Sequence, residues 1–277
     1  MSQSDATHVR VTILGCGSSG GVPRVGGEWG ACDPNDPRNY RTRCSLLVEA
    51  YQGTYSHETS TVVLIDTSPD LRTQLLAAKV SHVDAILYTH DHADQSHGID
   101  DLRAIVYHQR KRIPTFMDAV TRENLVRRFG YIFETPPGSH YPALLDAHDM
   151  PLPGQVLTIH GPGGAIGFQV LAQNHGEIDS LGFRFGPVAY CNDCKILPQE
   201  SLDACKGVDL FIVDALRHIP HPSHAHLELS LEWIAEIQPK HAILTNMHID
   251  LDYATLAGGL PEHIVPAVDG MVVEVVI

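Results

Sequence analysis

The ten residues 89–98 read THDHADQSHG and hold three histidines and two aspartates within eight positions. They follow the apolar run VDAILY at 83–88, which is typical of a buried strand. A strand that ends there would place His90 and His92 on one side of a tight loop, with Asp94 just beyond. Imidazole nitrogens and a carboxylate at this spacing suit zinc, manganese or iron. We therefore predict a metal-binding loop at the end of this strand.

A plain polar surface loop is the alternative interpretation, because 18 of the 277 residues are histidine. The sequence after the loop argues against it. Residues 99–107 carry apolar side chains at helical spacing, so a helix should follow the loop as closely as the strand precedes it. A plain surface loop has no need of a strand directly before it and a helix directly after it, so the pattern favours the metal site.

The bulk composition predicts one α/β domain over residues 1–277, because the chain can bury a large core and shows no repeat, low-complexity tract or linker. Hydrophobic residues make up 43% of the sequence, and the formal net charge is −14. An acidic surface does not favour broad contact with a phosphate backbone. The composition therefore argues against a nucleic-acid partner and leaves a small-molecule substrate, with a homodimer open.

The ends and the cysteines predict a cytoplasmic protein. Residues 1–6 show no basic stretch followed by an apolar core, so no secretory signal is expected, and no apolar run approaches the ~18 residues of a membrane span. The six cysteines are then best interpreted as reduced thiols. Residues 191–194 read CNDC, which leaves redox or zinc use open. Without a second such pair, chance spacing is favoured.

The rest of the chain alternates between short apolar segments and amphipathic ones. Strands are predicted over residues 9–14, 44–49, 61–65, 83–88, 155–159, 167–171, 181–185, 188–190, 210–213, 242–244 and 271–277. Helices are predicted over 71–80, 99–107, 118–129, 199–206 and 228–237, and long loops over 24–44 and 134–151.

Several predicted strands stop at, or just before, a histidine or an aspartate. Any one of these residues alone is usually structural. Together they indicate a sheet that delivers ligands to one edge, where α/β folds generally bind them. The residues concerned are His90, His175, Asp193, Asp214 and His248.

Nearly the whole chain resembles metallo-β-lactamase-fold hydrolases, in the branch that contains PhnP-like phosphoribosyl cyclic phosphodiesterases and, more distantly, tRNase Z. The resemblance implies an α/β fold, the αβ/βα sandwich, with a dinuclear metal centre at its edge. The stretches that carry it are 15–23, 65–72, 88–94, Asp193, 214–217, 221–224 and 251–253.

The same resemblance implies the ligands. His90, His92 and His175 would hold the first metal ion. Asp94 and Asp193 would serve the second, with Asp193 bridging the two. Asp94 could also orient the attacking water or accept its proton. Behind these ligands, the resemblance implies two further carboxylates that order the loops, Asp66 and Asp214.

Two positions depart from the family pattern at the second ion. Gln95 and Asn246 stand where relatives carry histidine ligands, and His248, two residues further on, could reach the site instead. An amide oxygen is a weak ligand for zinc but tolerable for harder cations. We therefore expect one or two divalent ions, zinc or manganese, with iron as an alternative.

Phosphodiester hydrolysis is the first functional hypothesis, on a small phosphodiester, cyclic esters included. His224 lies where the family places a histidine that protonates the leaving group, and Arg217 and His221 are candidate substrate-binding residues. The alternative interpretations are an ion pair for Arg217 and a plain surface position for His221. Two other functions stay open: a thioester or lactone hydrolase on the same centre, and a metal-binding protein with little catalysis.

Overall fold

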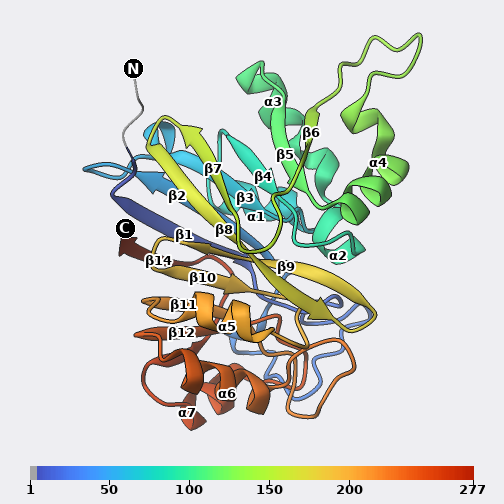
Figure 1. Ribbon diagram of the computed structural model, residues 1–277. Helices are drawn as coiled ribbons and strands as arrows, with labels where there is room; N and C mark the ends of the chain where they lie inside the picture. The colour runs from blue at the N-terminus through green and yellow to red at the C-terminus, as the bar shows by residue number, and fades with distance from the viewer. Residues whose placement is uncertain (1–4) are drawn as a thin grey trace.

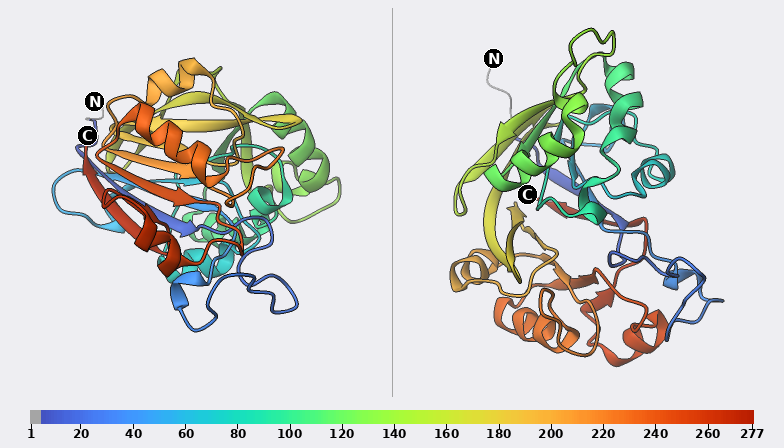
Figure 2. Two further views of the ribbon diagram at one scale, coloured as in Figure 1. Left: turned by 90° about the horizontal axis from the view of Figure 1, so that it is seen from below. Right: turned by 90° about the vertical axis from the view of Figure 1, so that its right-hand side faces the viewer.

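The computed structural model describes residues 5–277 and contains two seven-stranded β-sheets that pack face to face (Figure 1). Helices cover the outer face of each sheet. Figure 2 shows the two layers from further sides, with the green helices over one sheet and the orange and red helices over the other. The predicted αβ/βα sandwich is confirmed. The stretch 1–6, which gave no secretory signal, lies mostly outside the described residues.

The first sheet runs in the order β14-β1-β2-β3-β4-β5-β6. Strands β3 to β6 pair in parallel, because helices return the chain to the same end of the sheet between them. The strands are β1 (His8–Gly15), β2 (Ser45–Tyr51), β3 (Thr61–Ile65), β4 (Ala85–Leu87), β5 (Ile113–Met117), β6 (Leu145–Asp149) and β14 (Met271–Val276). The helices are α1 (Leu71–Ala77), α2 (Ala93–Ser96), α3 (Arg103–Gln109) and α4 (Ala119–Phe133), with 3₁₀ turns at Pro37–Asn39, His57–Thr59 and Ile99–Leu102.

The second sheet runs in the order β13-β12-β11-β10-β9-β8-β7. Its last four strands along the chain are parallel and are connected by three helices on the outer face. The strands are β7 (Val156–Gly161), β8 (Gly164–His175), β9 (Ile178–Phe185), β10 (Val188–Cys191), β11 (Leu210–Asp214), β12 (His241–Thr245) and β13 (Ile264–Pro266). The helices are α5 (Gln199–Cys205), α6 (Leu227–Ile237) and α7 (Tyr253–Gly259).

The main core lies between the sheets, where apolar side chains from both inner faces are buried together. Phe168, Phe183 and Phe211 are fully buried there. A second apolar cluster packs under helices α1, α3 and α4. These two clusters fix the sheets, so the loops that follow β4, β10, β11 and β12 leave from a rigid base. None of the helices that the structure describes is long and apolar enough to cross a membrane.

The predicted loop over 134–151 is partly wrong, because residues 145–149 form strand β6 in parallel register with β5. Residues 145–149 read LDAHD and have little strand propensity, so pairing with β5 decides their conformation. Strand β5 itself contains Pro114, which masks a strand in the sequence. Strand β13 and helix α7 were also not predicted.

Gly98 lies where the loop of residues 89–98 packs on the start of α1. A Cβ atom at this position would lie 2.0 Å from the Ser68 carbonyl oxygen and 2.7 Å from Leu71 Cβ. We expect Gly98→Ala to lower the free energy of unfolding by about 2–3 kcal/mol, because backbone must move. Urea denaturation measures it.

Gly130 is the matched control for this prediction, because a Cβ atom there meets nothing within 4 Å. It lies in helix α4 directly after a kink at Phe129, and its φ is outside the left-handed region, so alanine should cause no strain there. Gly130→Ala should therefore leave stability unchanged or raise it. Equal stability of Gly98→Ala and the wild type would show that the loop and α1 can separate without cost.

Candidate metal centre

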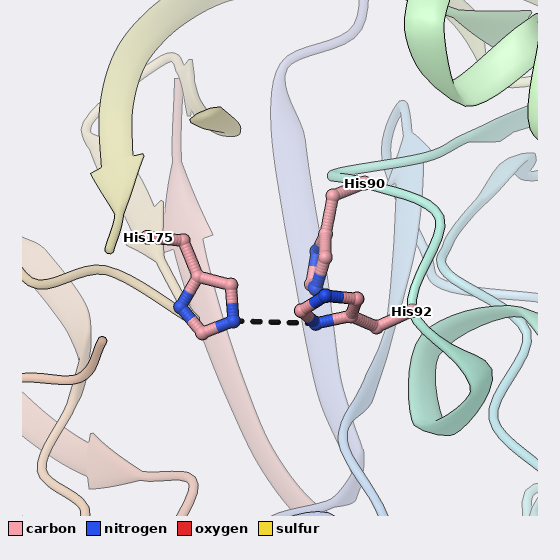
Figure 3. A group of neighbouring side chains, drawn as sticks. All are labelled: His90, His92 and His175. Carbon is pink, nitrogen blue, oxygen red and sulfur yellow. Dashed lines mark hydrogen bonds between the residues drawn. The ribbon is translucent and has the colours of Figure 1, made fainter. Parts of the chain in front are cut away.

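Three histidines from two separate parts of the chain meet at one edge of the sandwich. His90 and His92 lie in the loop between β4 and α2, and His175 is the last residue of β8. Their ring centroids lie 4.6–5.1 Å apart. Figure 3 shows the rings turned toward one another, with His175 Nε2 3.3 Å from His92 Nδ1. One ligating nitrogen from each lies within 4.8 Å of the other two, which is close enough for a shared ion.

Hydrogen bonds on the far side of each ring orient the two buried histidines. Thr89 Oγ1 donates to Asp66 at 2.8 Å, so His90 Nδ1 donates to that hydroxyl at 2.9 Å. His175 Nδ1 donates to the Ser223 carbonyl at 2.7 Å. Both rings therefore carry their lone pair on Nε2. His90 Nε2 is buried and has no hydrogen-bond partner in the region the structure describes, as expected for a metal ligand.

The protonation state of the trio also suits a metal ion. Burial, followed by the neighbouring imidazole of His224, lowers the pKa of His175 to about 4. Burial, followed by the imidazoles of His92 and His175, lowers the pKa of His90 well below its usual value. Neutral rings keep the lone pairs that bind a divalent cation.

Asp193 lies beside the trio, at the residue where the chain leaves β10 with φ of 50°. Its Oδ2 accepts hydrogen bonds from Gln95 Nε2 at 3.0 Å and Asn192 Nδ2 at 2.5 Å. Its Oδ1 accepts one from Asn246 Nδ2 at 3.3 Å. Burial raises the pKa of Asp193 well above its usual value. The carboxylate lies within 4.8 Å of a ligating atom of His175, but it does not converge with all three histidines of the trio.

His224 forms a pair with the buried carboxylate of Asp214, whose Oδ2 lies 2.9 Å from His224 Nδ1. Burial opposes the charged form of His224, but Asp214, Asp193 and Asp94 outweigh it and raise its pKa to about 9. The ring centroid lies 4.5 Å from that of His175. With Nδ1 engaged by Asp214, Nε2 is the nitrogen left to exchange a proton at the centre.

The residues fit one metal ion but not the second. The three imidazoles supply a ligand set that zinc and manganese accept. Gln95 and Asn246 instead direct their amide N–H groups at Asp193, and Gln95 Oε1 has no hydrogen-bond partner within residues 5–277. His248 pairs with Asp250 at 3.0 Å and contacts Arg24, away from the trio.

The remaining predicted residues lie around the centre. Asp66 acts through Thr89, as a carboxylate behind His90. Arg217 donates to the carbonyls of Ile219 and Pro220 at 3.1 and 3.0 Å, so it braces its own loop. The ring of His221 lies 5.1 Å from that of His224.

Two arginines that the sequence did not single out lie in the cavity next to the metal-binding loop. A cavity of about 500 Å³ adjoins the metal-binding loop, and Arg24, Arg43 and the half-buried Asp94 line it. Both arginines belong to the loop 24–44, which has almost no regular structure and gave no signal of its own. A third cation, Arg128 of α4, holds the Asp91 carboxylate at 2.8 Å and so braces the loop between the first two histidines.

Comparison with known proteins identifies the family of this chain. A family model described as "Beta-lactamase superfamily domain" matches residues 61–249. An octanoyltransferase of Porphyromonas gingivalis (strain ATCC BAA-308 / W83) is 32% identical over 269 residues, or 95% of this chain and 51% of that protein. The chain thus spans about half the length of the curated relative it matches.

Solved structures cover the chain almost completely. A diphosphatase from the PhnP family is 32% identical, with a TM-score of 0.84 over 97% of this chain and 98% of its own. Zn²⁺-bound PqqB from Methylobacterium extorquens is 14% identical, with a TM-score of 0.67 over 95% and 99% of the two chains, and shows the fold alone. The predicted resemblance is confirmed, and the chain belongs to the β-lactamase superfamily, with the metallo-β-lactamase fold.

Proposed function

We propose that this protein is a phosphodiesterase that acts on a small phosphodiester, cyclic esters included. The observation that carries the proposal is the His224–Asp214 pair beside the three convergent imidazoles. A histidine held by a buried carboxylate is suited to protonate an alkoxide leaving group. The similar PhnP-family protein is named a diphosphatase, and that name supports hydrolysis at a phosphoryl group in general. A cytoplasmic location stays part of the proposal.

We assign different side chains around one phosphoryl group to metal binding and to proton transfer. His90, His92 and His175 would hold a divalent ion, which would supply Lewis acidity and a deprotonated nucleophile at neutral pH. Asp94, on the wall of the adjoining cavity, accepts the proton of the attacking water. Zinc or manganese is the proposed ion, with iron as an alternative.

Two further sets of residues bind and release the substrate. Arg24 and Arg43 offer guanidinium groups to the phosphate oxygens across the same cavity. His224 protonates the departing oxygen, and Asp214 keeps its ring in place.

The purified protein loaded with Mn²⁺ or Zn²⁺ should hydrolyse bis-(p-nitrophenyl) phosphate at least roughly 1000-fold faster than the metal-free protein. The expected rise follows from the need for a deprotonated nucleophile at neutral pH. Release of p-nitrophenolate measures it, with the chelated protein as control. A folded, metal-loaded protein without turnover would favour the metal-binding protein with little catalysis.

Hydrolysis of an acyl thioester is the second candidate, and one observation favours it: the P. gingivalis relative is named for octanoyl transfer. A thiolate needs little protonation when it leaves, so the His224–Asp214 pair would have no role in that reaction. Assays of an octanoyl thioester and the phosphodiester on the same preparation compare the two activities directly. A kcat/KM that is larger for the thioester would replace our proposal.

A further inference from the structure

Three amide groups surround Asp193 where the family pattern calls for a second metal ion. Gln95 donates at 3.0 Å, Asn192 at 2.5 Å and Asn246 at 3.3 Å. All four side chains are at most 2% exposed. We propose that this chain holds a single metal ion and that this amide cage, formed by Gln95, Asn192 and Asn246, takes the place of the second ion. The inference rests on the metal centre of the proposed function and goes beyond it to the number of ions.

Hydrogen bonding explains why the cage excludes a cation. Both oxygens of the Asp193 carboxylate already accept N–H donors, which supply the partial positive charge that a second ion would supply. To ligate an ion, Gln95 or Asn246 must turn its amide so that the carbonyl oxygen replaces the N–H group. That turn removes a hydrogen bond from a buried carboxylate and gains only a weak neutral ligand.

The nearby histidines do not complete a second site. His175, Asp193 and His224 bring ligating atoms within 4.8 Å of one another. This group shares His175 with the trio, so a second ion would keep two ligands of its own. The oxygens of Asp193 are held by the amide cage. The second ligand, His224, has its Nδ1 2.9 Å from Asp214 Oδ2, so that nitrogen is already engaged.

His248 is not available to a second ion either. Its Nδ1 lies 3.0 Å from Asp250 Oδ2, and the guanidinium of Arg24 is in contact with the other side of its ring. A cation bound there would sit against the positive charge of Arg24, which disfavours it.

The position of Asp94 also agrees with a single ion. Its carboxylate belongs to neither group of converging ligands in the described chain and lines the cavity with Arg24 and Arg43. In a centre with two ions, the family pattern would use Asp94 as a ligand. With one ion, Asp94 is not needed as a ligand and keeps its place on the cavity wall.

The test counts metal ions per chain. Wild-type protein reconstituted with excess Zn²⁺ and then desalted should contain one ion, measured by elemental analysis. The double variant Gln95→His/Asn246→His should approach two, because imidazoles bind zinc better than amide oxygens do. Histidine is tolerated at position 246, where φ is 60°. Glu123→His on the exposed face of α4 controls for an added imidazole and should stay at one ion.

Each outcome of this test either supports or overturns the inference of a single ion. Two ions in the wild type, or none, would overturn the inference whether or not the variant folds. One ion in a double variant with an intact thermal transition would show that the cage is not what excludes the second. One ion in the wild type without phosphodiesterase activity would support the inference and contradict the proposed function, so the two can fail separately.

Discussion

His92→Ala should bind its metal ion more than roughly 100-fold more weakly than the wild type and lose phosphodiesterase activity by about 1000-fold or more. His92 supplies one of three imidazoles, and Asp193 cannot replace it because amide donors hold both carboxylate oxygens. The ring of His92 is exposed, so alanine leaves no cavity in the core and the fold should persist. Competition with a chromophoric chelator measures the affinity.

His97→Ala is the matched control for this prediction. His97 lies in the same loop, but its ring packs edge-on against Phe129 at 5.5 Å and takes no part in the trio. Metal affinity and activity should therefore remain within a few-fold of the wild type. Full metal retention by His92→Ala would show that His92 does not coordinate the ion. Equal losses of metal affinity and activity in both variants would indicate a general effect on the loop.

The sequence predicted the local part of this centre and not its long-range part. His90 and His92 are two residues apart after an apolar strand, so their spacing alone carries the signal. His175 and Asp193 come from other strands; their places at predicted strand ends made them candidate ligands, and the family resemblance assigned them to ions. Sequence spacing says nothing about which strand ends meet, because sheet order depends on pairing across the whole chain.

The departures at Gln95 and Asn246 were visible in the sequence, but their effect was not. An amide can face a site with its oxygen or with its nitrogen, and these two choices favour opposite ligands. The surrounding contacts decide between them: the carboxylate of Asp193 attracts the N–H groups. The arginines of the cavity were missed for a related reason, because residues 24–44 form a loop whose course is set by its neighbours and not by a periodic pattern.

In the fold, too, local sequence patterns predicted some elements, and long-range contacts determine the others. Strands with continuous apolar runs, such as β3 and β11, were predicted correctly because both faces are buried. Strand β6 was missed because it lies at the edge of its sheet and needs only one apolar side chain, Leu145, inside the core. At such an edge, pairing with a neighbour outweighs local preference.

His224→Asn should lower kcat by roughly 10²–10⁴-fold for a phosphodiester with an alkoxide leaving group and by less than about 10-fold for the p-nitrophenyl ester. An alkoxide is a strong base that needs a proton as it departs, whereas p-nitrophenolate is stable without one. Asparagine keeps a polar group near Asp214 but cannot transfer a proton at neutral pH. Steady-state kinetics on the two esters measure the split, and metal content must stay at the wild-type level.

Asp214→Asn tests the same pair from its other member. Asp214 is fully buried and holds His224 Nδ1 at 2.9 Å, so the amide should disturb the tautomer and orientation of the ring. The loss should again be larger for the alkoxide ester, because both variants act on one proton transfer. Equal losses on the two esters would show that His224 does not protonate the leaving group. Loss of the metal ion from His224→Asn would instead assign this histidine to coordination, since a proton donor contributes nothing to metal affinity.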